Sequence, residues 1–240
     1  MSSKNMNTVK IYDGPSLLDG KPIIVLLTGL AKSSKNGKTG DMLQTWILRK
    51  DINPNEAQKT GDDSSVCGNC PLRPLTFSAT PKSERVSAKR CYVKVHHAPL
   101  STWKANRDLH VTPSVDVVPL LDGRPVRFGS YGDPAAVPDS VWEPLRPGRN
   151  FTGYTHQWET HSATTNMASV HSPEERERAK RKGYRTFRII RNVSEREPGE
   201  VLCPASKEAG NKTDCATCGL CMGDAHAKGL KARDVAIVAH

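Results

Sequence analysis

The C-terminal part of the chain contains four cysteines whose spacing is typical of metal ligands. Cys215, Cys218 and Cys221 form a C-x2-C-x2-C run, and Cys203, which is followed by a proline, lies upstream of it. The compact triple favours an iron–sulfur cluster, because ferredoxin-type runs have this spacing and end in a more remote Cys-Pro. A structural zinc, which usually takes two separated cysteine pairs, is the alternative, and a disulfide or an inert role is a third interpretation.

A second cysteine group lies in the first half of the chain and consists of Cys67, Cys70 and Cys91. Three thiolates can hold a [4Fe–4S] cluster that has one iron open to another ligand. Together with His96 or His97 they could instead form a Cys3His zinc site. We therefore expect one or two [4Fe–4S] clusters as cofactors, with Zn²⁺ as the alternative.

Length and composition predict one main domain. The chain has 240 residues, of which 36% are hydrophobic and 25% charged, enough for one substantial core. Residues 1–22 are polar and contain Gly-Pro and Asp-Gly, which predicts an N-terminal arm or a short hairpin. Residues 23–240 are expected to form a single α/β domain.

The distribution of apolar residues and cysteines predicts a cytoplasmic protein. The N-terminus lacks the apolar stretch of a signal peptide, and no run of 18 apolar residues is present, so we expect no membrane partner. Seven cysteines, an odd number gathered in two groups, fit metal ligation in a reducing compartment better than disulfides.

The net charge of +10 makes nucleic acid a candidate partner, since lysine and arginine release counterions from phosphates. The basic residues are densest in the helix expected near 174–182 and in the loop 81–90. An equally good interpretation of the helix is a solvated face, because glutamates are interleaved with its basic residues.

Short apolar runs alternate with helical segments, which predicts βα units and a mostly parallel sheet. About eight strands can be counted, the number that a (β/α)8 barrel requires, so we expect a barrel-like α/β fold with long cysteine-rich loops. The expected strands are 23–28, 92–95, 126–131, 150–155, 165–170, 184–190, 200–203 and 234–239. The expected helices are 41–49, 98–108, a segment containing Val137, Val141 and Leu145, and 172–183.

Polar residues follow the ends of these strands, where such barrels carry their chemistry. Asp133, Tyr154 and His156 are the candidates for binding or protonating a substrate, because histidine titrates near neutral pH. Gly132 and Thr155 are candidate cofactor-binding residues. Further polar residues or ligands at expected strand ends are Cys91, His171, Cys203 and His240.

A set of motifs carries a resemblance to a known family. The motifs are CGNCPLR, CYVKV, VRFGSYGDPAAVP, TGYTHQW, NMASVHS, YRTFRI, CPASKEAG and CATCGLC. As a set they resemble a family of uncharacterised, largely phage-borne cysteine-rich proteins. The chain is more distantly similar to phage proteins with a barrel akin to that of radical SAM enzymes. The resemblance implies a barrel-like fold with iron–sulfur or zinc ligands and, if the protein is phage-encoded, a place in the host cytoplasm.

Three functions follow as hypotheses. The first is an iron–sulfur redox or radical-type enzyme, or an electron carrier, with one fully ligated cluster and one open metal site for a small-molecule or macromolecular substrate. The second is a zinc-stabilised nucleic-acid-binding protein, and the third is a structural or host-interaction protein. The chain has neither a C-x3-C-x2-C loop nor a Gly-Gly-Glu strand end, so the usual residues for S-adenosylmethionine are missing.

Overall fold

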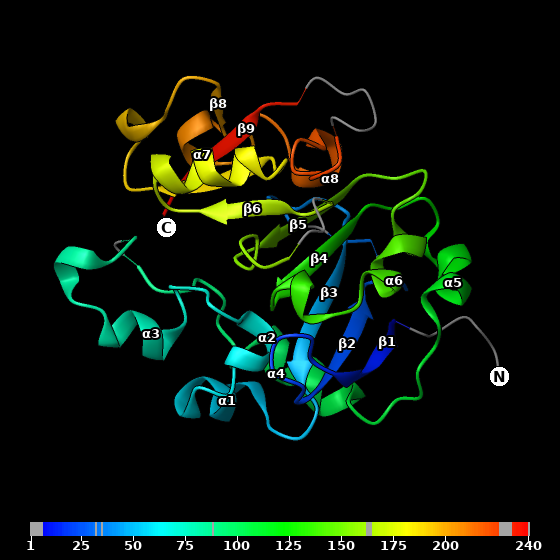
Figure 1. Cartoon of the computed structure of the whole chain (residues 1–240). Helices are drawn as coiled ribbons and strands as arrows, with labels where there is room; N and C mark the ends of the chain where they lie inside the picture. Colours follow the sequence, from blue (N-terminus) through cyan, green and yellow to red (C-terminus); the bar gives the residue numbers. More distant parts are fainter. Residues whose placement is uncertain are drawn as a thin grey trace.

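A computed structural model describes residues 7–31, 33–34, 36–87, 89–161, 165–225 and 232–239. These residues form a mixed α/β structure around one nine-stranded sheet with the order β1-β2-β3-β4-β5-β6-β7-β9-β8 (Figure 1). The strands are β1 (Thr8–Pro15), β2 (Pro22–Thr28), β3 (Leu43–Arg49), β4 (Val126–Tyr131), β5 (Phe151–Thr155), β6 (Met167–Val170), β7 (Thr186–Ile190), β8 (Glu200–Leu202) and β9 (Asp234–Val238).

The helices are short and lie in the connections between the strands. The α-helices are α1 (Pro54–Thr60), α2 (Ser64–Cys67), α3 (Pro74–Ala79), α4 (Ala98–Asn106), α5 (Ser114–Val117), α6 (Asp139–Trp142), α7 (Pro173–Arg181) and α8 (Cys215–Cys218). The 3-10 turns are η2 (Lys82–Glu84), η3 (Val118–Leu121), η4 (Pro134–Ala136), η5 (Glu143–Leu145), η6 (Val193–Glu195) and η7 (Lys207–Ala209). No helix in the described part of the chain is long and apolar enough to cross a membrane.

The sheet is antiparallel at its N-terminal edge and parallel elsewhere. β2 pairs antiparallel with both β1 and β3, and every pairing from β3 to β8 is parallel. The expected mostly parallel α/β sheet is thus confirmed. Thr8–Pro15, placed by the sequence in an arm or short hairpin, is the first strand and forms a hairpin with β2.

The strands do not close into a barrel. Among the described residues no pairing joins β1 to β8, so these two strands are the edges of an open sheet. In Figure 1, β2 to β4 run steeply while β6 runs nearly across the view, which shows how strongly the sheet twists. The expected closed arrangement of eight parallel strands is therefore not what the strand pairing gives.

Three local predictions were wrong. The segment 41–49 contains β3, Leu43–Arg49, rather than a helix, since Thr45, Trp46 and Ile47 favour a strand that can pair with β2. Residues 92–95 lie in a loop that follows a hydrogen bond from the Cys91 N–H to the Leu72 carbonyl. The expected helix around Val141 is divided into η4, α6 and η5, because the prolines within it remove N–H donors.

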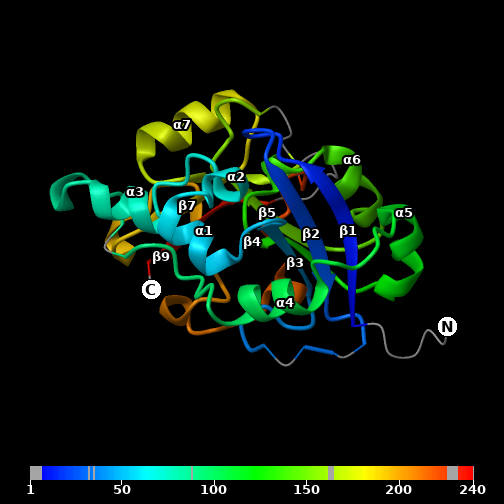
Figure 2. The same ribbon diagram turned by 90° about the horizontal axis from the view of Figure 1, so that it is seen from below.

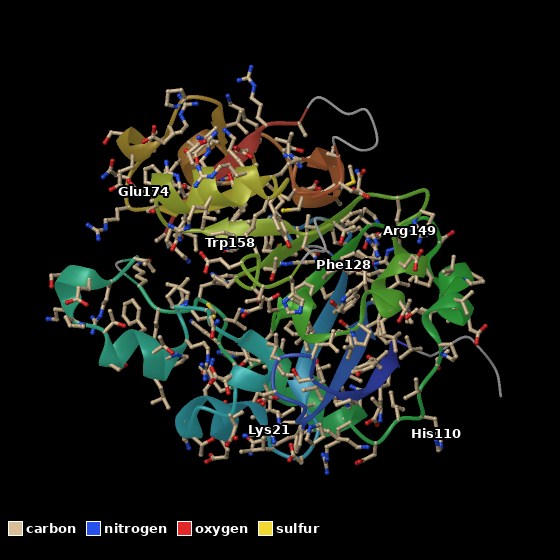
Figure 3. All side chains as sticks on the ribbon, in the orientation of Figure 1. Lys21, His110, Phe128, Arg149, Trp158 and Glu174 are labelled. Carbon is tan, nitrogen blue, oxygen red and sulfur yellow. The ribbon has the colours of Figure 1, made fainter. Side chains whose placement is uncertain are left out.

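The main core lies around β2, whose residues from Ile23 to Leu27 are fully buried on both faces. Phe128 of β4 adds an aromatic cluster, with its ring centroid 5.0 Å from that of Trp142 and 5.3 Å from that of Phe151. Figure 3 shows Phe128 in the interior, whereas Lys21, His110 and Glu174 lie at the periphery. Phe128 and Phe151 thereby anchor β4 and β5 in the core, close to the polar residues that follow these strands.

Helix α7 begins as the sequence predicts and covers one face of the parallel strands. The Ser172 hydroxyl accepts a hydrogen bond from the Glu175 N–H, and Pro173 occupies the first helical turn. Ala179 of α7 packs with Ala168 and Val170 of β6, and Figure 2 shows the helix lying along one side of the sheet. The neighbouring residue of β6, Ser169, consequently points to the opposite face.

Candidate metal centre

All seven cysteines line one cavity with a volume of about 460 Å³. Its wall includes alternate residues of the parallel strands, so one face of the sheet forms the floor of the cavity. These residues are Arg127, Gly129 and Tyr131 of β4, Thr152 and Tyr154 of β5, Ser169 of β6, Phe187 and Ile189 of β7, and Val235 and Ile237 of β9. The cavity thus lies opposite the face that α7 covers.

The N-terminal cysteine group, Cys67, Cys70 and Cys91, is shaped by tight turns. Cys67 ends α2, the Cys70 N–H donates to the Cys67 carbonyl at 3.2 Å, and the Cys91 N–H donates to the Leu72 carbonyl at 2.8 Å. The backbone N–H of Leu72 also donates to the Cys70 sulfur, and that of Val93 to the Cys91 sulfur. N–H groups aimed at sulfur stabilise a thiolate, which is the form that binds metals.

The C-terminal cysteine group, Cys203, Cys215, Cys218 and Cys221, comes from the end of β8 and from α8. The backbone N–H of Ala205 donates to the Cys203 sulfur. As in the N-terminal group, the donor lies two residues after the cysteine. Asp214 caps α8 by accepting a hydrogen bond from the Thr217 N–H at 2.9 Å. The run of Cys215, Cys218 and Cys221 therefore begins at a capped helix N-terminus.

A distant loop anchors this C-terminal group. The N–H of Cys215 donates to the Lys38 carbonyl at 2.9 Å, and the N–H of Ala216 donates to the Thr39 carbonyl at 3.1 Å. A Cβ added to Gly40 would lie 2.4 Å from an Asp214 carboxylate oxygen, so only glycine allows the approach. The Gly/Lys-rich loop after β2 therefore positions the cysteine loop, a role that its sequence does not reveal.

Burial raises the pKa values of thiols that belong to each of the two groups. It raises the pKa of Cys70 and of Cys221 to about 12 and that of Cys67 well above its ordinary value. Neighbouring thiols of the same group add to the effect, such as Cys70 acting on Cys67 and Cys203 acting on Cys221. Each group therefore gathers thiols within electrostatic reach of one another, and a metal would have to displace their protons.

In the part of the chain that the structure describes, no three histidine, cysteine, aspartate or glutamate side chains gather closely enough to hold one metal ion. A tetrahedral zinc with bonds of about 2.3 Å needs sulfurs roughly 3.8 Å apart. His96 and His97, considered as zinc ligands, are exposed and do not line the cavity.

Asp133 lines the cavity but is also the centre of a hydrogen-bond network. One carboxylate oxygen accepts from the Ala135 N–H at 3.0 Å, and the other accepts from the His156 N–H at 2.8 Å and the Gln157 amide at 3.3 Å. The Asp133 N–H donates to the Val66 carbonyl at 2.6 Å. Asp133 thereby fixes the end of β5 against α2, which carries Cys67.

The end of β5 presents a pair of histidines. His156 lines the cavity, and its Nε2 lies 3.1 Å from Nε2 of His171 at the end of β6, with the rings stacked at 14°. Burial lowers the pKa of His156 to about 3 and that of His171 to about 4, so both are neutral at pH 7. Nδ1 of His171 is buried without a hydrogen-bond partner within the described structure.

The other candidate residues divide between the cavity and the layer behind it. Tyr154 lines the cavity, its ring contacts Phe187 and its hydroxyl donates to the Cys221 sulfur. Thr155 points away from the cavity, because its hydroxyl accepts from the Gln157 N–H and donates to Asp133. Gly132 lines the cavity, and its Cα lies so close to β3 that a Cβ would be 2.6 Å from that of Ile47.

Sequence reasoning missed several residues of the site. Arg127 lies on the cavity wall, and Gln157 links Asp133 to the Cys67 carbonyl. The strand-end rule that identified Asp133 could also have identified Gln157, but it gives no signal for Arg127, which lies within a strand. His240, also expected at a strand end, falls outside the described residues.

The basic helix α7 is paired with acidic residues on its surface. Arg178 donates to Glu159 at 3.1 Å and Lys180 to Glu177 at 3.2 Å. These contacts agree with a solvated helix face, and nucleic-acid binding stays a prediction.

The fold and the cavity define an α/β protein with a mostly parallel open sheet and seven cysteines around one pocket. Comparison of the chain with protein families, with curated proteins and with solved structures found no match. The evidence for a function therefore lies in the site itself.

Proposed function

We propose that this chain is an iron–sulfur protein with two clusters that face a common cavity, where it performs redox or radical-type chemistry on a bound substrate. Cys203, Cys215, Cys218 and Cys221 would hold one cluster with all four irons ligated. Cys67, Cys70 and Cys91 would hold a second cluster with one iron left for an exogenous ligand. The observation that carries the proposal is that all seven cysteines line the same cavity of about 460 Å³.

The donor set supports clusters over mononuclear zinc. Four thiolates on one zinc must converge on one point, whereas a [4Fe–4S] cluster takes each thiolate on a different iron, so its cysteine sulfurs stand farther apart. The C-x2-C-x2-C run of Cys215, Cys218 and Cys221 has the spacing of cluster ligands, and thiols within each group lie within electrostatic reach of one another. The backbone N–H groups that donate to Cys70, Cys91 and Cys203 are the kind of contact that tunes cluster potentials.

The clusters would supply one-electron chemistry, and this chain's own residues would hold the substrate. His156 and Tyr154 face the cavity and can exchange hydrogen bonds with a ligand there. His156 is backed by His171, which holds its imidazole in place. Asp133 positions the end of β5 and does not bind the substrate itself, since its carboxylate oxygens already accept hydrogen bonds from backbone and amide groups.

We further propose that the sheet is a partial barrel, in line with the resemblance to phage cysteine-rich proteins. Support comes from the alternate residues of β4, β5, β7 and β9, which share one face and enclose the cavity together with the cysteine loops. Barrels of this kind place their chemistry at the carboxyl ends of parallel strands, where Asp133 and His156 lie.

Separate cysteine substitutions test whether there are two clusters. Cys91→Ala should remove the iron of the N-terminal group, and Cys218→Ala that of the C-terminal group, so each variant should keep roughly half of the wild-type iron and sulfide. Metal analysis of anaerobically purified protein checks this. The control is Ser169→Ala, which also alters the cavity wall and should keep the full load. Equal iron in Cys91→Ala and the wild type would remove Cys91 from the ligand set.

The Tyr154 hydroxyl offers a finer test. Its hydrogen bond to Cys221 should favour the more negative, reduced cluster, so Tyr154→Phe should lower the reduction potential of that cluster. A net contribution of about 1 kcal/mol corresponds to a shift of roughly 40 mV for one electron. Anaerobic potentiometry measures the shift. An unchanged potential would show that the hydroxyl does not act on a cluster bound by Cys221.

A further inference from the structure

Arg127 lies on the cavity floor between the two cysteine groups. Its Nη2 donates to the hydroxyl of Tyr92, which directly follows Cys91, at 2.6 Å. On the other side it is within electrostatic reach of Tyr154 and Cys215 of the C-terminal group. A fixed cation therefore stands where a molecule between the two groups would lie.

This guanidinium has no carboxylate partner in the described structure. Arg127 forms no ion pair there, and its buried Nε has no hydrogen-bond partner. Asp133 is the one acidic residue on the described cavity wall, and its oxygens are engaged by Ala135, His156 and Gln157. Arg127 is half-buried, and a guanidinium that is partly removed from water without a counter-charge is costly, so this position suits an anion from outside the chain.

The surroundings of Arg127 restrict what such an anion could be. Lys38, Lys89 and Arg90 also line the cavity, so its wall is strongly positive. The part of the floor that β7 and β9 form, beyond β5 and β6 from Arg127, is apolar and consists of Phe187, Ile189, Val235 and Ile237. A volume of about 460 Å³ has room for a small organic molecule.

We propose that the cavity binds a small organic anion, a carboxylate or a phosphate monoester with an apolar body. The guanidinium of Arg127 takes the anionic group, for which its planar array of donors is suited. The apolar body packs on Phe187, Ile189 and the β9 valine and isoleucine. That this anion is the substrate of an enzyme rests on the proposed function. Its binding to Arg127 does not require a cluster.

The competing account is that Arg127 only balances the negative charge of clusters held by the cysteines. In that case an anion gains nothing over a neutral molecule of the same shape. The two accounts differ in whether binding depends on the charge of the ligand.

Isothermal titration of the anaerobically purified protein with 4-phenylbutyrate, phenyl phosphate and neutral 4-phenylbutan-1-ol separates them. At least one anion should bind roughly 10- to 100-fold more tightly than the alcohol, as expected for a charged hydrogen-bond pair. Which anion is preferred distinguishes a carboxylate from a phosphate ligand. In Arg127→Gln the preference should fall to about one, whereas Arg178→Gln on the opposite helix α7 should keep it.

Arg127→Lys guards against a folding defect, since it keeps the charge and should retain part of the preference. The proposal is overturned if the wild type prefers neither anion, or if the preference survives in Arg127→Gln. Iron and sulfide are measured on the same samples. If the protein contains no iron but still prefers an anion in a way that depends on Arg127, only the cluster proposal is refuted. If the protein contains iron but shows no preference for an anion, only the anion site is refuted.

Discussion

Replacing Glu200 by glutamine is expected to lower the free energy of unfolding at pH 7 by about 3–5 kcal/mol, the usual cost of breaking a buried ion pair. The Glu200 carboxylate is fully buried and accepts hydrogen bonds from Arg188 at 2.8 and 2.7 Å and from the Glu197 N–H at 2.8 Å. Its loss leaves the buried Arg188 guanidinium without its counter-charge. Urea denaturation of the two proteins measures the difference.

The effect should depend on pH in a defined direction. Burial raises the pKa of Glu200, but the hydrogen bonds from Arg188 and the Glu197 N–H outweigh it and hold that pKa below its ordinary value of 4.5. A lowered folded-state pKa means that the carboxylate stabilises the protein above about pH 4.5 and loses this effect as the pH falls further. The difference between wild type and Glu200→Gln should therefore be constant near neutrality and shrink below that pH.

The control for Glu200 is an exposed glutamate. Glu159→Gln removes a surface pair with Arg178 and should change the stability by no more than about 0.5 kcal/mol. Equal losses in the two variants would show that burial of the Arg188–Glu200 pair is not what makes it important.

The second large effect is expected at Gly132. Its φ is +88°, and a Cβ would meet the Ile47 Cβ at 2.6 Å and the carbonyl oxygens of Ile47 and Val66 at 3.0 and 3.2 Å. Gly132→Ala should cost about 2–5 kcal/mol, which combines the strain of a left-handed residue with overpacking. Since Asp133 bonds to Val66 beside Cys67, the variant should also lose metal from the N-terminal cysteine group.

Gly148 gives the matched control, because its φ is +73° but nothing lies within 4 Å of an added Cβ. Gly148→Ala should cost only about 1–2 kcal/mol and leave the metal content unchanged. If Gly132→Ala were as stable as Gly148→Ala and lost only ligand binding, Gly132 would serve the cofactor, as the sequence predicts, and not the packing.

The sequence predicted those parts of the fold that depend on local patterns. The strand ending at Tyr131 and the helix capped by Ser172 were identified because apolar runs and capping residues act within a few residues. Residues 41–49 were assigned wrongly, since the pairing of β3 with β2 decides their conformation. The predicted closure of the sheet into a barrel was wrong for a related reason, because the number of strands does not determine whether the two edge strands pair.

For the site, spacing singled out the candidate ligands but not their surroundings. The C-x2-C pattern singled out two cysteine groups, yet nothing local shows that Cys91 and Cys203 face the same cavity. The contact between Lys38 and Cys215 and the position of Arg127 arise from tertiary packing, which brings together segments far apart in the chain.

The most direct test of the account is the amount of iron and acid-labile sulfide bound per chain after anaerobic purification. Two [4Fe–4S] clusters predict about eight iron and eight sulfide for every chain. Zinc bound without sulfide, in protein that stays colourless after incubation with iron and sulfide, would contradict the proposal that these seven cysteines hold clusters.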